Sequence, residues 1–302
     1  MEENQKFDVI IAGGSYAGLS AAMSLGRAIR KVLIIDSGKP CNLQTPHSHN
    51  HLTRDGSTPA EFNEIARNQV LAYPTVQIKE GKVISVTGEN QNFEVYTESG
   101  EHFGASKVLF ATGVKDMMPA IPGFKESWGI SVIHCPYCHG YEYRDQNTGI
   151  LTNGEHAFDF TKLIHNWTKT LTIFTNGPAA FNTDVRQKIE NLGVNIVENK
   201  ISKIEHQKGY IEQIVFEDGS SVPLKAVYAR IPFVQHSDIP EKMGCEYTEH
   251  GYIKIDDMQR TSVAGIYAAG DNTTMMRAVS GAIAAGSKSG AIINHDLISE
   301  GN

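Results

Sequence analysis

The sequence predicts an α/β protein with two domains and parallel sheets. Its 302 residues are enough for two separate cores. Near the N-terminus, an apolar strand, a glycine turn, a small-residue helix and a second apolar strand follow one another. This order is typical of parallel strands joined by a helix. Two later apolar runs also end in glycine-containing turns, which indicates that the same architecture continues along the chain.

The first strand is expected over residues 7–12, a nearly all-apolar run that leads into the turn Gly13–Gly18. Short continuous apolar runs are typical of buried parallel strands. Residues 19–29 are predicted to form a helix whose small residues face the sheet. Residues 32–35 form the second strand, which ends at Asp36. Together these segments make one complete strand–turn–helix–strand unit.

The turn differs from the G-x-G-x-x-G pattern of dinucleotide sites at one position, where Ser15 replaces the middle glycine. Serine is small enough to let backbone amides approach a pyrophosphate at a helix N-terminus. Asp36 follows the next strand, where a carboxylate would bind the ribose hydroxyls of the adenosine half. A glycine turn alone can serve only helix–sheet packing, but the flanking strands and the acid favour a dinucleotide site. The turn residues predicted to contact the dinucleotide are Gly13, Gly14, Ser15, Ala17 and Gly18.

Two later strand ends extend this site. A strand that includes residues 107–110 runs into an Ala-Thr-Gly turn, and a strand over residues 265–269 runs into Gly-Asp. A helix of small residues is predicted after the second turn, over residues 278–294. The residues at the two turns are Ala111, Thr112, Gly113, Gly270 and Asp271.

Cys135 and Cys138 form a Cys-x-x-Cys pair in the segment CPYCHGYE. This spacing allows a small disulfide ring that opens and re-forms easily, as redox cycling requires. It is also the commonest half of a zinc site. However, Cys41 and Cys245 stand alone in the sequence, and the histidine-rich run 47–51 has no cysteine pair near it. The pattern therefore favours a redox pair, and no metal ion is expected.

The composition excludes several classes of partner. The net charge of −7 argues against nucleic acid and anionic membrane surfaces. The first residues are polar, and no apolar run reaches membrane-spanning length. Four cysteines, two of them in a redox pair, suit a reducing cytoplasm better than a secreted protein stapled by disulfides. We therefore expect a cytoplasmic protein that binds neither nucleic acid nor membrane.

The order of the motifs resembles that of low-molecular-weight thioredoxin reductases: glycine turn, Ala-Thr-Gly, Cys-x-x-Cys, Gly-Asp. The sequence Cys-Pro-Tyr-Cys-His-Gly is similar to a branch of this family related to dithiol oxidases. The resemblance extends from Phe7 to about Leu297. It implies two Rossmann-like dinucleotide-binding domains, the second inserted in the first, with FAD as the cofactor and a homodimer as the assembly.

By the same resemblance, the FAD-binding domain would comprise residues 1–116 together with 246–302. The inserted domain, residues 117–245, would carry the redox pair. Helix and strand breakers support both crossovers. These residues are Pro119, Pro122 and Gly123 at the first crossover, and Pro232 and Pro240 before the second.

The resemblance also implies roles for single residues. Cys138 would face the flavin, and Cys135 would exchange with the external sulfur. His139 stands where thioredoxin reductases carry an acid. An imidazole of ordinary pKa could take a thiol proton at neutral pH, although the side chain could also only orient the turn. Further flavin contacts are expected from Asn50, Arg277, Ala278 and Val279.

The expected pyridine-nucleotide site departs from the family pattern. Thr152 replaces its first glycine, and Glu155 places a carboxylate where a pyrophosphate would lie, which the helix dipole opposes. The strand 171–174 ends in Thr175–Pro178, without the family's arginine pair and without an acid that would favour NADH. Ile231–Phe233 replaces a glycine-containing approach to the nicotinamide. NADP(H) is therefore a doubtful cofactor.

Three classes of function remain. The first is an FAD-dependent thiol–disulfide oxidoreductase that exchanges electrons between a substrate, the Cys135–Cys138 pair and FAD, with dithiol oxidation by O2 favoured over NADPH use. The second is a thioredoxin reductase that uses NAD(P)H or another donor such as ferredoxin. The third is a non-catalytic flavin-bound sensor, although an intact cysteine pair argues against it. The expected partner is a thioredoxin-like protein or a small-molecule dithiol or disulfide.

Overall fold

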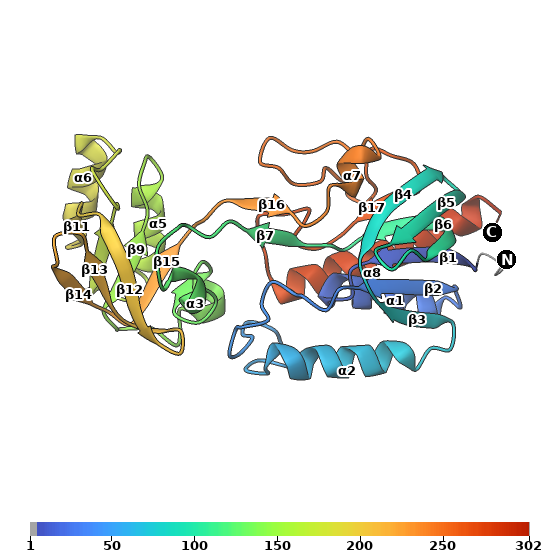
Figure 1. The fold of residues 1–302 in the computed structure, drawn as a ribbon, viewed down its shortest axis with the longest axis horizontal. Coiled ribbons are helices and arrows are strands. Elements are labelled where there is room, and N and C mark those ends of the chain that lie inside the picture. The colour runs from blue at the N-terminus through green and yellow to red at the C-terminus, as the bar shows by residue number, and fades with distance from the viewer. Residues whose placement is uncertain (1–4, 302) are drawn as a thin grey trace. The chain divides into compact units, whose positions relative to one another are not determined.

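The computed structural model describes residues 5–301, which divide into two compact units (Figure 1). Unit 1 contains residues 5–43, Pro59–Lys115 and 233–301. Unit 2 contains Gln44–Thr58 and Asp116–Pro232. Each unit has its own sheet with parallel strands and its own apolar core, so the predicted α/β fold is confirmed.

A mixed sheet forms the centre of unit 1. Its strands in spatial order are β3 (Val76–Glu80), β2 (Val32–Asp36), β1 (Lys6–Ala12), β6 (His102–Phe110), β5 (Asn92–Thr97) and β4 (Val83–Glu89), and β17 (Ile266–Ala268) also pairs with β6. The strands β1, β2, β3, β6 and β17 are parallel, whereas β4 and β5 form antiparallel pairs. The carboxyl ends of β1, β2, β6 and β17 therefore meet at one edge.

Helices α1 (Tyr16–Arg27) and α8 (Val279–Ser299) pack closely against each other in unit 1. A Cβ atom at Gly286 would lie 2.1 Å from the carbonyl oxygen of Ala17, so glycine is needed where the backbones meet. Helix α2 (Pro59–Leu71) packs beside α1, and the short α7 (Ile239–Lys242) lies near β4. Helix α1 begins at Tyr16, earlier than predicted, because the N-cap residue Ser15 belongs to the glycine turn.

A parallel sheet forms the centre of unit 2. Its strands in spatial order are β11 (Asn195–Val197), β10 (Leu171–Phe174), β9 (Thr148–Leu151), β15 (Ala226–Ala229) and β8 (Val132–Ile133). An antiparallel sheet contains β12 (Ile201–Gln207), β13 (Tyr210–Phe216) and β14 (Ser221–Pro223). The helices are α3 (Phe124–Ser127), α4 (Pro136–His139), α5 (Ala157–Ile164) and α6 (Thr183–Glu190). The strands β7 (Val114–Asp116) and β16 (Phe233–Gln235), one from each crossover, pair with each other.

The unit boundaries differ from the predicted domain limits in two places. The chain returns to unit 1 at Phe233 rather than at residue 246, because Ile239 and Cys245 belong to the same apolar core as Phe7. Residues 44–58 belong to unit 2, where the side chain of Gln44 donates a hydrogen bond to the carbonyl oxygen of Trp128. Such long-range contacts leave no local pattern in the sequence.

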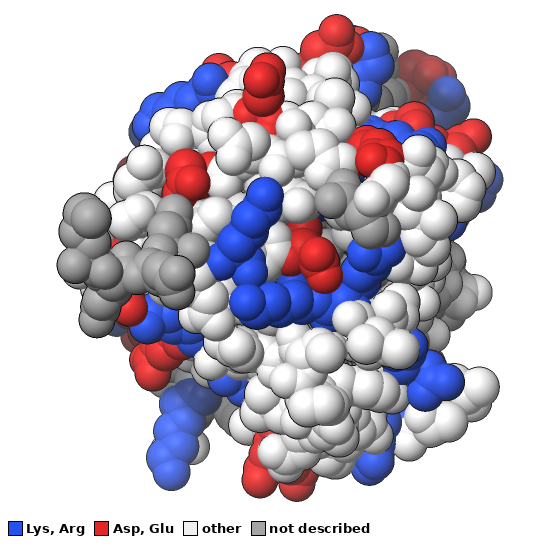
Figure 2. Space-filling model, turned by 90° about the vertical axis from the view of Figure 1, so that its right-hand side faces the viewer, with Lys and Arg blue, Asp and Glu red and all other residues white. Residues whose placement is uncertain are grey.

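Charged side chains of both signs are interspersed on the face that Figure 2 shows, in keeping with the modest net charge of −7. Within residues 5–301, no helix is both long enough and apolar enough to cross a bilayer.

Candidate functional site

The glycine turn after β1 is held tightly beneath α1. Gly13 has a φ of +107°, and a Cβ atom there would lie 2.3 Å from the carbonyl oxygen of Ala111. At Gly18 a Cβ atom would lie 1.9 Å from the carbonyl oxygen of Gly13. Both positions therefore require glycine. The close passage brings the turn under the N-terminus of α1, where the first N–H groups have no partner within the helix and can bind an anion.

Asp36 joins the end of β2 to this turn. The Gly14 N–H donates to Asp36 Oδ1 at 3.1 Å, and Arg67 Nη1 lies 3.4 Å from Asp36 Oδ2. The Asp36 side chain is only 16% exposed. A largely buried carboxylate beside a helix N-terminus is well placed to bind the ribose hydroxyls of an adenosine group.

A cleft opens at the carboxyl edge of the unit 1 sheet. Predicted residues that line it are Gly13, Gly14, Ser15, Asp36, Ala111 and Thr112. Among the residues that the structure describes, Thr112 Oγ1 and Asn63 Oδ1 are buried without a hydrogen-bond partner, and both residues line the cleft. Buried polar atoms normally have partners, so this cleft suits a polar ligand. Ala17 and Gly18 lie in the first turn of α1, and Gly113 directly follows Thr112.

The cleft is also lined by two lysines and a histidine that the sequence reasoning missed. Lys39 follows β2, Lys82 precedes β4, and His236 lies after β16; all three line the cleft. A pyrophosphate-containing ligand would find compensating positive charge there. These residues come from loops with no recognisable motif, so only the tertiary structure identifies them.

The Gly-Asp turn after β17 lies near the N-terminus of α8. Arg277 Nε lies 3.6 Å from Asp271 Oδ2, and Gly270 has a φ of +98°. The neighbouring Asn272 is fully buried and donates a hydrogen bond to the carbonyl oxygen of Phe110 at 2.8 Å, which ties this turn to β6. Ala278 is the N-cap residue of α8, and Val279 is its first residue. The structure thus brings the predicted residues Asp271 and Arg277 together.

The Cys135–Cys138 pair lies at the start of α4 in unit 2. The two cysteines are not joined in a disulfide, and the Cys138 Sγ–H donates to Cys135 Sγ at 2.6 Å. This hydrogen bond, together with the N–H groups of Cys138 and Tyr137, lowers the pKa of Cys135 to about 7. At that pKa roughly half of the Cys135 thiol is ionised at pH 7, and the thiolate is the nucleophile in disulfide exchange.

His139 differs from the expectation of an ordinary imidazole pKa. Burial, together with the nearby His134 and His49, lowers the pKa of His139 to about 4. The imidazole is therefore neutral at pH 7, where it can accept a proton but carries no charge to stabilise a thiolate. Burial thus leaves an uncharged imidazole that is also a weaker base than an ordinary histidine.

Two histidines close to the Cys135–Cys138 segment were not identified as site residues from the sequence. His134 directly precedes Cys135, and its ring stacks on Trp128 with centroids 5.7 Å apart. His49 Nε2 lies 3.6 Å from Glu142, and its Nδ1 lies 3.4 Å from Asp55. Because His49 comes from the distant loop 44–58, its sequence position gives no sign of this contact.

Aromatic side chains lie next to the Cys135–Cys138 pair in the sequence and pack around its turn. Tyr137 packs edge-on against Trp167 with ring centroids 5.4 Å apart, and the Arg144 guanidinium lies 4.0 Å from the Tyr141 ring centroid. A Cβ atom at Gly140 would lie 2.9 Å from the Trp167 indole, so glycine permits this packing. Tyr137 and Tyr141 are 62% and 66% exposed, which leaves both rings available to a partner.

The family model of the pyridine nucleotide-disulphide oxidoreductases matches residues 7–286. The chain belongs to this family. It is 33% identical to a probable thioredoxin reductase of Arthroderma benhamiae over 88% of this chain and 74% of that protein. It is also 31% identical to the thioredoxin reductase tcpT of Claviceps purpurea, over 100% of this chain and 98% of that protein.

Solved structures agree with this assignment. A putative thioredoxin reductase TrxB of Bacillus anthracis superposes with a TM-score of 0.93 at 33% identity, covering 97% of this chain and 99% of that one. The oxidoreductase therefore has the Rossmann-like architecture of the thioredoxin reductases, and the resemblance seen in its motifs is confirmed. Family membership also implies FAD binding, and the unit 1 cleft fits the adenosine and pyrophosphate part of that cofactor.

Asn50, an expected flavin contact, lies in unit 2. Asn50 has a φ of +60°, and its N–H donates to Asp55 Oδ1 at 2.7 Å within the loop 44–58. Its contact with the flavin remains a prediction.

Within residues 5–301, no group of three or more His, Cys, Asp or Glu side chains is arranged to hold a metal ion. Cys41 and Cys245 lie in unit 1, near Asp271 and Thr261 respectively.

Proposed function

We propose that this oxidoreductase exchanges electrons between a dithiol or disulfide substrate, the Cys135–Cys138 pair and FAD. Dithiol oxidation with O2 as the final acceptor is the favoured direction, without efficient use of NADPH. The observation that carries the proposal is the pair itself. One thiol has a pKa of about 7 and accepts a hydrogen bond from the other, in a chain that also has a dinucleotide cleft.

The residues of the cleft divide naturally between the parts of FAD. Gly13, Gly14 and Ser15 would hold the pyrophosphate at the N-terminus of α1, and Asp36 would hold the adenosine ribose. Asp271, beside Arg277, would bind the ribityl chain. When bound, FAD supplies a two-electron acceptor, and its reduced form can in turn be oxidised by O2.

The thiol chemistry follows from the two cysteines. In the oxidised enzyme, a substrate thiolate attacks the Cys135 sulfur of the Cys135–Cys138 disulfide, and Cys138 leaves as a thiolate. The second substrate thiol then attacks the substrate sulfur of the mixed disulfide, so that Cys135 leaves. The substrate has become a disulfide, and the pair has gained two electrons. The substrate thiols release two protons to solvent; neutral His139, whose pKa is about 4, can relay one of them but does not hold it at pH 7.

The doubt about NADPH rests on unit 2. Thr152 and Glu155 occupy the turn after β9, where the family has glycine and where a pyrophosphate would lie. A carboxylate there repels the anion that the helix dipole would otherwise attract. The segment Thr175–Pro178 after β10 supplies no cation for a 2′-phosphate.

An anaerobic titration distinguishes the readings. We expect dithiothreitol to bleach the flavin absorbance of the purified protein readily, and millimolar NADPH to bleach it slowly or not at all. Bleaching by NADPH on the order of 10 per second would instead establish a thioredoxin reductase of the usual kind. A flavin that no dithiol bleaches would favour a non-catalytic sensor. Bleaching by a reduced ferredoxin but not by dithiols would favour a thioredoxin reductase that takes its electrons from ferredoxin.

The substrate is proposed to be a thioredoxin-like protein or a small dithiol or disulfide. The relatives are named thioredoxin reductases, and the exposed rings of Tyr137 and Tyr141 offer a contact surface beside the pair. A homodimer and a cytoplasmic location remain predictions from the resemblance and the cysteine content.

A further inference from the structure

The carboxyl edge of the unit 2 sheet contains a cross-link between two loops. In parallel α/β sheets, nucleotides bind at this edge, in the crevice between the loops that follow neighbouring strands. Here the loop after β9 and the loop after β10 face each other, because the two strands pair in parallel with Leu171 opposite Thr148. An open crevice between them would be needed to admit the adenosine half of a dinucleotide.

The side chain of Asn153 connects the two loops. Its Nδ2 donates to the carbonyl oxygens of Thr175 at 3.2 Å and Pro178 at 3.0 Å. Its Oδ1 accepts from the N–H groups of Gly154 at 3.0 Å and Ala180 at 2.6 Å. The amide thus uses both its donor and its acceptor capacity on backbone groups at the mouth of the crevice.

The loop after β10 is fixed from its other side as well. Thr175 Oγ1 donates to the carbonyl oxygen of Gly177 at 2.6 Å, and the Ile201 N–H donates to Asn176 Oδ1 at 2.8 Å. The loop therefore has little freedom to move away from Asn153 without breaking several hydrogen bonds.

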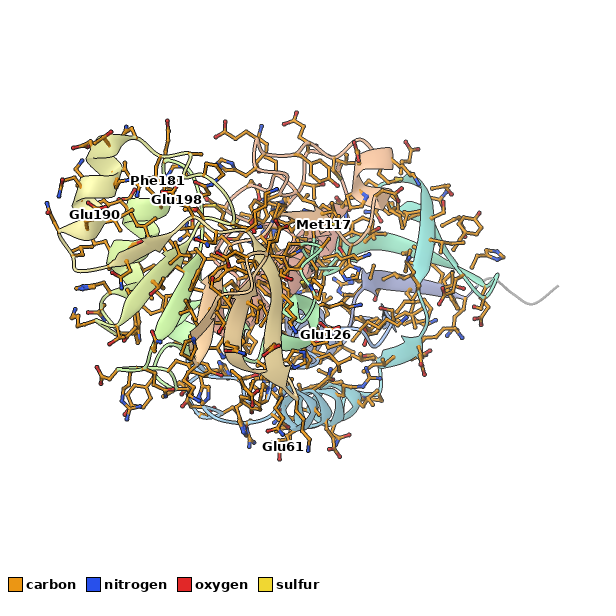
Figure 3. All side chains as sticks on the ribbon, turned by 60° about the vertical axis from the view of Figure 1, so that its left-hand side comes forward. Glu61, Met117, Glu126, Phe181, Glu190 and Glu198 are labelled. Atoms are coloured by element: carbon orange, nitrogen blue, oxygen red, sulfur yellow. The ribbon has the colours of Figure 1, made fainter. Side chains whose placement is uncertain are left out.

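A carboxylate lies at the same edge. Glu198 follows β11 and accepts a hydrogen bond from the Ala179 N–H at 2.8 Å, and Arg186 on α6 pairs with it. The Ala179 N–H and the Arg186 guanidinium lower the pKa of Glu198, which stays ionised at neutral pH. Glu198 and Phe181 are both labelled in Figure 3, and the Phe181 ring centroid lies 5.8 Å from the Arg186 guanidinium. Arg186 is thus already engaged with an anion of the protein.

We infer that Asn153 is a specificity-determining residue that excludes pyridine nucleotides from unit 2 by holding these two loops together. This rests on the proposed function, and it identifies the contact that makes the enzyme independent of NADPH. A dinucleotide would have to displace the Asn153 side chain from the Gly154 and Ala180 N–H groups before it could use them. That displacement would also leave the carbonyl oxygens of Thr175 and Pro178 without their donor.

The test compares Asn153→Gly with Asn182→Ala in the FAD-loaded full-length protein. Glycine removes every side-chain bond of Asn153 and suits a tight turn. Asn182 caps α6 by accepting a hydrogen bond from the Val185 N–H at 2.9 Å, so its removal costs a comparable side chain–backbone bond elsewhere in unit 2. Calorimetric titration with NADH is the readout. We expect the apparent Kd to fall at least about tenfold in Asn153→Gly and to stay unchanged in Asn182→Ala.

Hydrogen exchange supplies an independent readout that needs no nucleotide. In Asn153→Gly the Ala180 amide should exchange faster than in the parent protein, because its acceptor is gone. Unchanged exchange at Ala180 would show that the cross-link does not form in solution, and faster exchange without tighter NADH binding would show that it excludes nothing. Either result overturns the inference. A parent protein that binds NADH tightly and is reduced by it would instead overturn the proposed function.

Discussion

Cys135 shows how a single hydrogen bond prepares a side chain for chemistry. The Cys138 thiol is the largest cause of the lowered pKa of Cys135, whereas burial opposes the shift. Cys138→Ala should therefore raise the pKa of Cys135 from about 7 toward the ordinary thiol value of about 8.5. The rate of iodoacetamide alkylation measured against pH reports this midpoint. The exposed Cys41 should be replaced by serine in both proteins. An unchanged midpoint would mean that another group ionises Cys135.

His139 makes stability depend on pH. Its pKa in the folded protein is about 4, below the ordinary value near 6.5 in the unfolded chain. The unfolded chain therefore binds more protons between these values, so stability falls as the pH is lowered from 6.5 toward 4. Between pH 6.5 and pH 4, we expect the free energy of unfolding of His139→Gln to fall by about 2 kcal/mol less than that of the parent, as measured by urea unfolding. The exposed His250→Gln serves as the control and should match the parent. Equal losses in all three proteins would contradict a buried neutral imidazole.

At the scale of the elements, the β1–α1 turn determines the cofactor cleft. Gly13→Ala would strain a backbone with φ of +107° and press a methyl group against the Ala111 carbonyl oxygen. We expect this variant to be purified largely without FAD, as measured by the ratio of flavin to protein absorbance. Gly100→Ala is the matched control, since Gly100 also has a positive φ, +84°, but nothing lies within 4 Å. Its strain of about 1 kcal/mol should leave the flavin content unchanged. Equal flavin content in both variants would show that the clash is relieved.

The sequence predicted those elements that a continuous run of residues identifies, such as an apolar strand or a glycine turn. The strand 171–174 agrees with β10, and the predicted strand 7–12 lies within β1, because continuous apolar runs identify buried strands. The strand that ends before Ala111 is longer than predicted, since its first residues pair with the antiparallel β5. The glycine turn and the cysteine pair could be found because each is contiguous. His49 and Lys82 could not, since contacts made by separate loops bring them to their sites.

At the scale of the whole molecule, the sequence indicated two domains but not their limits. Proline and glycine mark both crossovers, yet they do not show where the apolar residues after the second crossover pack. Cys245, which stands alone in the sequence, is buried in the core of unit 1, and burial raises the pKa of its thiol. Ile239 and Ile253 belong to the same core. Packing between distant segments decides such boundaries, and it leaves no periodicity that a single sequence reveals.

The pairing of β6 with β17 and of α1 with α8 has a consequence for biosynthesis. Unit 1 needs residues 266–299 to complete its sheet and its helix pair. Every strand and helix of unit 2 precedes them in the chain. Since domains generally fold as units during translation, unit 2 can fold completely before the last strand of unit 1 has been synthesised. Flavin can then be captured only after residues 266–299 have been synthesised, and until that point the nascent chain carries the Cys135–Cys138 pair without its cofactor.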